Sequence, residues 1–208
     1  MNHAVIDLSE NFLRLGLLRK DGLWQEYSEP MRGRESSRLA VKVTAKLQEW
    51  GVGLKDVNMW TVGAGPGNFT GLRMAASFIA GLAAADKSLQ VRNVPSAYMY
   101  SGLQEDGTPC PAAVIYDGKN SELVIFRTGD NSGCVCTYAE AEEVLKSWGN
   151  ITFRTTPADR ETVEKVLKDI SVTLPDGGIS LKTLAEARLP FNGSVSALEY
   201  IRPAVRPH

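Results

Sequence analysis

The sequence contains few of the side chains on which many enzyme classes depend. Its two histidines, His3 and His208, lie at opposite ends of the 208-residue chain. A Ser-His-Asp or Cys-His catalyst, or a histidine-rich metal site, would have to recruit a terminal residue, which disfavours these classes. We expect both histidines to be exposed or to lie on edge strands.

Cysteine is also scarce. Cys110, Cys134 and Cys136 are too few and too irregularly spaced for a disulfide framework. No histidine or second cysteine pair accompanies Cys134 and Cys136. We therefore interpret these two residues as thiols on one face of a half-buried strand rather than as a metal site.

Blocks of one charge and long apolar runs are absent. The formal net charge is −1 and the basic residues are scattered, which argues against tight nucleic-acid binding by this chain alone. No apolar run reaches membrane-spanning length, and residues 1–10 lack the layout of a signal peptide. The sequence therefore predicts a cytoplasmic protein that does not bind membranes.

Apolar periodicity predicts an α/β protein with two lobes of mixed sheet flanked by helices. The first lobe, residues 1–104, is predicted to have the order β-β-β-α-β-α-β-α. Its two long helices cover residues 36–50 and 69–84. A smaller second lobe, residues 110–208, follows a linker, and its C-terminal tail has room to return to the first lobe. Residues 4–7 and 113–117 are alike, which suggests two lobes of one ancestral design.

A glycine-rich turn joins the predicted strand 57–62 to the helix 69–84. It does not continue into the Gly-Lys-Ser/Thr of a Walker loop, and Asn68 stands where a dinucleotide fingerprint needs glycine. Two readings stay open. The turn is a tight strand-to-helix connection capped by Asn68 or Thr70, or it faces a phosphate or partner. The candidate binding residues are Gly63, Gly65, Pro66, Gly67, Asn68, Thr70, Gly71 and Arg73, with Arg73 available to a phosphate or a carboxylate.

Asp7 and Asp117 each end the first predicted strand of a lobe, next to a turn. In a two-lobed phosphoryl-transfer protein these positions hold magnesium and phosphates. The alternative is an Asx-turn or cap in a hairpin. Both readings remain open for both residues.

The glycine-rich turn closely resembles the "GxGPGSFTGxR" signature of the TsaB (YeaZ) family, with Asn68 in place of its serine. Other islands follow in the family's order. They are residues 5–9 for its opening "AIDTS", residues 35–39 for His-Ser-x-x-Leu, residues 117–122 for "DARRGEVY" and residues 200–202 for "YLR". In the second of these islands Glu35 replaces the usual histidine.

The resemblance implies the two-lobed fold of the actin and hexokinase-like ATPase superfamily. It implies a non-catalytic part in making threonylcarbamoyladenosine in tRNA, beside a TsaD-like catalytic subunit and a TsaE-like ATPase. The chain is then expected to form a homodimer when alone and to meet tRNA only indirectly. It should need no metal or cofactor of its own, although a nucleotide can sit at a partner interface.

The resemblance further implies that pairing uses the helices over 36–50 and 69–84. Because the second helix carries small residues, a surface formed by these two helices would bury close to the roughly 1,000 Å² expected of a specific protein–protein contact. We expect the core stripe of that helix to include Ala80, and its small-residue surface to include Gly71 and Ala75. The expected interface residues are Leu39, Val43, Leu47, Met74, Ser77, Phe78 and Gly81.

A rival hypothesis is a stand-alone small ATPase or kinase of the same superfamily. Asp7 and Asp117 would then hold magnesium, and the glycine-rich turn would bind a phosphate. A peptidase is disfavoured because no zinc motif is present and no serine or cysteine has a usable histidine.

Overall fold

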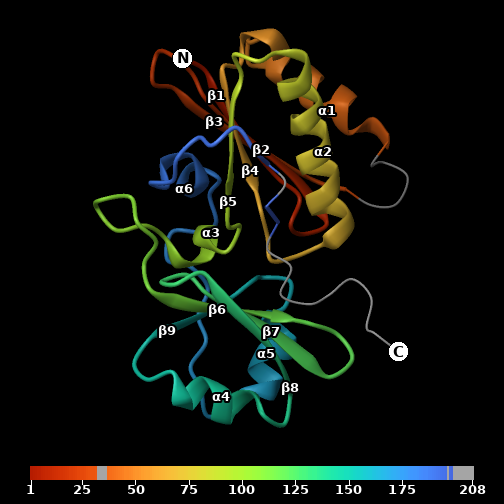
Figure 1. Ribbon diagram of the computed structural model, residues 1–208. Helices are drawn as coiled ribbons and strands as arrows, with labels where there is room; N and C mark the ends of the chain where they lie inside the picture. The colour runs from red at the N-terminus through yellow and green to blue at the C-terminus, as the bar shows by residue number, and fades with distance from the viewer. Residues whose placement is uncertain (32–36, 196, 199–208) are drawn as a thin grey trace. The chain divides into compact units, whose positions relative to one another are not determined.

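The computed structural model describes residues 1–31, 37–195 and 197–198 (Figure 1). The predicted features at Glu35, Ser36, residues 200–202 and His208 lie outside these residues. The chain divides into two compact units. Met1–Ser96 forms the first unit together with residues 180–195 and 197–198, and Ala97–Ile179 forms the second.

The first unit contains a five-stranded mixed sheet in the order β3-β2-β1-β4-β5. The strands are β1 (His3–Asp7), β2 (Phe12–Leu18), β3 (Trp24–Pro30), β4 (Met59–Gly63) and β5 (Gln90–Val94). The helices are α1 (Leu39–Glu49), the short 3-10 helix η2 (Leu54–Asp56), α2 (Phe69–Ala85) and α6 (Lys182–Glu186).

The central strand β1 is buried along its whole length, because it pairs with β2 antiparallel and with β4 parallel while helices cover both faces. Helices α1 and α2 lie on one face of the sheet and α6 on the other (Figure 1). The core beneath α1 and α2 includes Ile6, Leu15, Val43, Trp60 and Ile79.

His3 corrects the expectation of an exposed or edge-strand histidine. It is buried in the central strand, and its Nε2 lies 2.8 Å from the Thr61 hydroxyl oxygen. The Arg92 Nε donates to the same oxygen, so the Thr61 hydroxyl is left to donate to a neutral His3 ring. Burial, and then the charge of Arg92, lower the pKa of His3 to about 4.

Arg92 ties residues 184–189 to the sheet of the first unit. Its guanidinium donates to the backbone carbonyls of Leu184, Ala185, Ala187 and Leu189 at the C-terminal end of α6. A cation suits these carbonyls because they carry the negative end of the helix dipole. Through these bonds a segment far along the sequence belongs to the first unit.

The second unit repeats the plan of the first. Its sheet has the order β8-β7-β6-β9, and β6 pairs antiparallel with β7 and parallel with β9. This matches the order β3-β2-β1-β4 and supports the predicted internal repeat. The strands are β6 (Ala112–Asp117), β7 (Glu122–Arg127), β8 (Ser132–Thr137) and β9 (Thr152–Thr155). The helices are α3 (Tyr98–Ser101), α4 (Ala141–Ser147) and α5 (Arg160–Val166).

Helices α4 and α5 contribute to a core with one face of this sheet, while α3 packs on β6 and β9. The sequence assigned the α3 segment to the first lobe, whereas its contacts place it in the second unit. Cys134 and Cys136 lie two residues apart on β8, in contact with the α4 and α5 core, as expected for a half-buried strand.

Helix α5 ends at Val166. Thr173 forms a bridge with Arg154 of β9, and this pairing needs extended chain soon after the helix. Across the described ranges no helix combines the length and apolarity that a membrane crossing requires.

Candidate functional site

The glycine-rich turn connects β4 to α2 and packs against the end of β1 and the residues after it. Three of its glycines are needed for this close approach. A Cβ on Gly63 would overlap the Asp7 carboxylate, one on Gly67 would overlap the Ser9 carbonyl, and one on Gly71 would overlap the Leu8 carbonyl. The glycines therefore allow two backbone segments of the same unit to touch.

Backbone N–H groups along the turn find acceptors inside the first unit. Gly65 N donates to the Ser96 hydroxyl over 3.0 Å, and Asn68 N donates to the Ser9 carbonyl over 2.5 Å. Asn68 caps α2, since its Oδ1 accepts from Thr70 N and Gly71 N over 3.1 and 3.3 Å. These donors stabilise the turn itself, which favours the reading of a capped strand-to-helix connection over that of a phosphate cradle.

Asp7 is the centre of this packing and is fully buried. Its Oδ1 accepts from Ser9 N at 3.1 Å and from the Ser9 hydroxyl at 2.7 Å, the pattern of an Asx-turn. Its Oδ2 accepts from the Ser96 hydroxyl at 2.5 Å, and Arg14 Nη1 lies 3.8 Å from Oδ1. To hold magnesium, Asp7 would have to give up these bonds.

Burial raises the pKa of the Asp7 carboxyl, although the hydrogen bonds from Ser96 and Ser9 and the charge of Arg14 oppose the rise. Ser96 is a residue whose role the sequence did not reveal. It follows β5, and the parallel pairing of β4 with β5 brings it beside Asp7 and Gly65. No spacing in the sequence predicts that Ser96 contacts Asp7 and Gly65.

Asp117 ends β6 in the second unit and is held differently. Its Oδ1 accepts from Lys119 N at 2.9 Å and from the Tyr138 hydroxyl at 3.0 Å, and its Oδ2 pairs with Lys119 Nζ at 2.5 Å. Burial alone would raise the pKa of Asp117, but these hydrogen bonds and the Lys119 charge outweigh it and lower the pKa. Asp159 lies near enough for its carboxyl to feel the charge of Lys119.

Magnesium binding by Asp7 and Asp117 together stays a prediction. The two residues belong to different units, and each carboxylate is engaged by its own unit. Within residues 1–31, 37–195 and 197–198, no group of three or more His, Cys, Asp or Glu side chains is arranged to hold a metal ion.

Arg73 and Thr70 project from the first turn of α2 and are exposed. The Arg73 guanidinium lies 3.8 Å from the centre of the Phe69 ring, a cation–π distance. This stacking holds the charge at the surface beside the turn.

The predicted interface residues separate into three groups. Leu39, Val43 and Leu47 are buried in the core of the first unit, which corrects the prediction that their side chains lie in an interface. Met74 and Phe78 are partly buried against the same core. Ser77 and Gly81 are exposed.

Helix α2 is also rotated about its axis relative to the prediction. Gly71 and Ala75, expected on the small-residue surface, are buried, whereas Ala80, expected in the core, is exposed. The reason is local, because Gly71 lies against the Leu8 carbonyl and this contact fixes which face of the helix meets the sheet. The exposed face is formed by Thr70, Arg73, Ser77, Ala80, Gly81 and Ala84, and we call it the outer face of α2.

The two mixed sheets with flanking helices and the repeated strand order define the chain as an α/β protein with two units of related plan, as the sequence predicted, and solved structures share this fold. The chain belongs to the family described as TsaD: tRNA N6-adenosine threonylcarbamoyltransferase, whose model matches residues 33–199. Membership of this family supports involvement in the biosynthesis of threonylcarbamoyladenosine in tRNA.

Solved structures agree with the family assignment at the level of the fold. YeaZ from Pseudomonas aeruginosa has a TM-score of 0.66 and 22% identity, with 89% of each chain covered. An uncharacterized protein with similarity to peptidase YEAZ, also from Pseudomonas aeruginosa, has a TM-score of 0.66 and 21% identity, with 88% of each chain covered. None of the curated proteins compared matches the chain. The family match and the fold shared with YeaZ together confirm the resemblance to the TsaB (YeaZ) family.

Proposed function

We propose that this chain is a non-catalytic subunit that supports a tRNA N6-threonylcarbamoyladenosine transferase by pairing with a TsaD-like catalytic subunit. The family match and the YeaZ-like fold support a place in this modification system. The observation that carries the non-catalytic part is the state of the glycine-rich turn. Its backbone donors and the buried Asp7 carboxylate are used in holding the first unit together.

The outer face of α2 is the proposed pairing surface. Ser77, Ala80, Gly81 and Ala84 are small, so a helix of another chain can approach the backbone of α2 closely. Val41 of α1 adds an exposed apolar side chain, at 63% relative exposure. Arg73 offers a cation at the edge of this surface for a partner carboxylate.

In this proposal the partner carries out the transfer and contacts the tRNA, and a TsaE-like ATPase joins the pair. A second copy of the chain takes the partner's place when the chain is alone. A nucleotide belongs to the partner interface, and this chain needs no cofactor of its own.

Co-purification with the TsaD-like protein encoded in the same genome tests the pairing. Ala80→Glu would bury an uncompensated charge in the interface, at a cost of roughly 3 kcal/mol, or about a hundredfold in affinity. Ala158→Glu is the matched control, because it makes the same change at an exposed position of the second unit. Thermal unfolding of both variants should resemble that of the wild type.

The proposal fails if Ala80→Glu and Ala158→Glu retain the partner equally well in size-exclusion chromatography. Calorimetry with ATP and magnesium on the isolated chain tests the rival ATPase. Tight binding followed by turnover would favour that rival. Loss of turnover in Asp7→Asn would then assign the activity to this site.

A further inference from the structure

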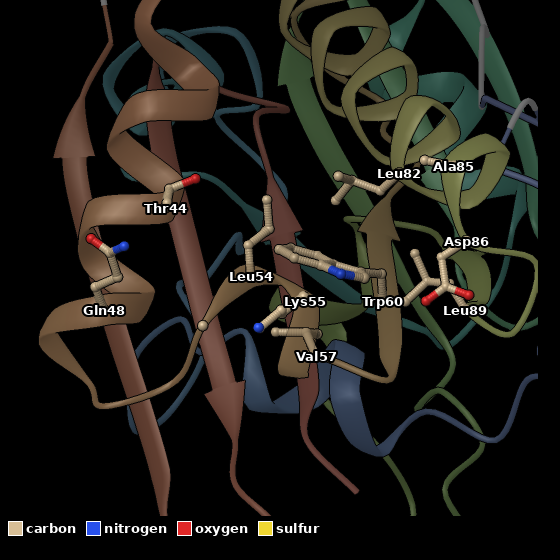
Figure 2. Close-up of a pocket in the computed structure, with 11 residues that line it drawn as sticks. Thr44, Gln48, Leu54, Lys55, Val57, Trp60, Leu82, Ala85, Asp86 and Leu89 are labelled. Atoms are coloured by element: carbon tan, nitrogen blue, oxygen red, sulfur yellow. The ribbon is translucent and has the colours of Figure 1, made fainter.

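The two faces of the first sheet are covered to different extents. On one face, α1 and α2 bury the main core, where Trp60 of β4 lies with Leu54 and Leu82 beside a cavity of about 490 Å³ (Figure 2). On the other face lies a segment that we call the strap, residues 180–191, which includes the five-residue helix α6. Its buried apolar side chains lie outside the main core, and they are Leu181, Leu184 and Ala187. Loss of the strap would therefore leave the main core covered.

A charged side chain fastens the strap at each end. At its start, the Glu26 carboxylate accepts from the Ser180 hydroxyl and the Leu181 N–H, over 2.8 and 3.0 Å. Towards its end, the Arg92 guanidinium donates to four backbone carbonyls of the strap and lies 4.4 Å from the centre of the Phe191 ring. Because Arg92 is buried, these carbonyls replace the water that its charge would otherwise bind.

His3 lies beside Arg92 under the same end of the strap. Its ring meets Phe191 edge-to-face, with 5.5 Å between the ring centres, and its Nε2 shares the Thr61 hydroxyl oxygen with Arg92 Nε. The neutral ring accepts the hydrogen of this hydroxyl. A protonated ring carries a hydrogen on both nitrogens and accepts none. Protonation would therefore place a second buried cation beside Arg92, at an oxygen that both would need as an acceptor.

The other charged side chains on the strands of this sheet and on the strap are paired, bonded to backbone or exposed, so they do not neutralise a second cation. They are Asp7, Arg14, Glu26, Glu29, Lys182, Glu186 and Arg188. Strand β4 has no charged residue, and Arg92 is the one on β5. Burial, and then the charge of Arg92, lower the pKa of His3, as this arrangement requires.

We propose that His3 and Arg92 form an acid-sensitive latch, in which protonation of His3 releases the strap from the sheet while the main core stays folded. Arg92 can move away from the second charge only by giving up the strap carbonyls and the Phe191 ring. A helix as short as α6 does not persist without such tertiary anchors. The chain passes from the second unit into the first between Ile179 and Ser180, so release lengthens the segment that links the units there.

Hydrogen exchange of the isolated chain at pH 7 and pH 5, followed by NMR, tests the latch. The Ala187 N–H, which donates to the Thr183 carbonyl over 3.1 Å, reports on the strap. The His3 pKa is about 4 in the closed state, and that of the released ring is near the ordinary 6.5. The latch therefore holds above the released pKa and weakens as pH falls. Corrected for intrinsic exchange rates, the opening constant of Ala187 should rise about twentyfold between pH 7 and pH 5.

The Ile79 N–H, in the part of α2 that packs on the main core, is the internal reference. Its opening constant should change by less than about twofold over the same range, because local release leaves this core closed. An equal rise at Ile79 and Ala187, or no rise at Ala187, would overturn the proposal. This comparison uses the wild-type chain and does not depend on how any variant folds.

His3→Gln puts a neutral amide that does not titrate beside Thr61, and should abolish the rise at Ala187. His208→Gln is the matched control, since it removes the other histidine of the chain and should leave the rise intact. A rise that survives His3→Gln would assign the response to another group and refute the latch. No partner protein is used, so failure here leaves the pairing proposal untouched.

Discussion

The two units begin with the same arrangement of strands, yet the aspartate that ends the first strand plays a different part in each. Asp7 is fully buried and accepts from Ser9, which is two residues away, and from Ser96, which is 89 residues away. Asp117 accepts from Lys119, two residues away, and from Tyr138. The repeat conserves the position, whereas the segments packed over each aspartate decide its chemistry.

The covering segment explains the difference. In the first unit the glycine-rich turn lies against the residues after β1, and Gly63 leaves room for the Asp7 carboxylate. In the second unit the connection after β6 returns directly into β7 through Lys119, Asn120 and Ser121, all at positive φ. Both aspartates hold a local turn, but Asp7 also joins segments 89 residues apart, whereas the longer contact of Asp117 spans 21 residues.

The largest contrast is expected from truncating each aspartate. Asp7→Ala leaves Ser9 and Ser96 donors without their acceptor in the core, and should lower the free energy of unfolding by about 3 kcal/mol. Asp117→Ala should cost about 1 kcal/mol, because the Lys119 side chain it releases is mostly exposed. Urea unfolding of both variants measures the difference, and equal losses would contradict the distinction between the two sites.

The next effect concerns the close approach in the first unit. In Gly71→Ala the new Cβ meets the Leu8 carbonyl, and we expect a loss of about 2 to 3 kcal/mol. Gly81→Ala is the control on the same helix, where a Cβ meets nothing within 4 Å. Alanine there should stabilise the chain by up to about 1 kcal/mol through helix propensity. The midpoint of thermal unfolding should fall in Gly71→Ala and rise in Gly81→Ala. A rise in both variants would refute the packing role of Gly71.

The pH dependence of the two aspartates should have opposite signs. The pKa of Asp7 is raised by burial, so its contribution to stability is present below the pKa of the unfolded chain and is lost as pH rises. The pKa of Asp117 is lowered, so its contribution is present above the unfolded pKa and is lost as pH falls.

Comparing Asp7→Asn and Asp117→Asn with the wild type across the acid range tests these signs. Asp7→Asn should remove a decline of stability with rising pH, and Asp117→Asn should remove part of the loss on acidification. Unfolding free energies measured in urea at each pH give the slopes. The difference in unfolding free energy between wild type and variant should change with pH in opposite directions for the two variants. A change in the same direction for both would show that burial does not dominate the pKa of Asp7.

The smallest effect is expected in the local turn of the second unit. Ser121 has a φ of 61°, so Ser121→Gly relieves a left-handed conformation and should stabilise the chain by about 0.5 kcal/mol. Ser121→Ala keeps the conformational cost and serves as the control. Differential scanning calorimetry measures the unfolding temperatures of the two variants. An equal shift in both would mean that the effect comes from loss of the hydroxyl rather than from the backbone conformation.

The sequence predicted those features that follow from local pattern. Leu39, Val43 and Leu47 recur at helical spacing, and α1 places all of them in the core. The α/β class and the repeated strand order also follow from short-range signals. The same spacing cannot say which helix faces stay exposed, and for that reason the predicted interface included core residues.

By itself, then, the sequence determined the class of fold, the two-unit plan and the glycines that a close approach requires. Tertiary structure alone decided what approaches them. The Leu8 carbonyl meets Gly71, and Ser96 reaches Asp7 from the end of another strand. Arg92 shares the Thr61 hydroxyl with His3 and also holds residues 184–189. These contacts join residues far apart in the chain, and no periodicity encodes them, because they depend on strand register and on which side chains a close-packed core leaves room for.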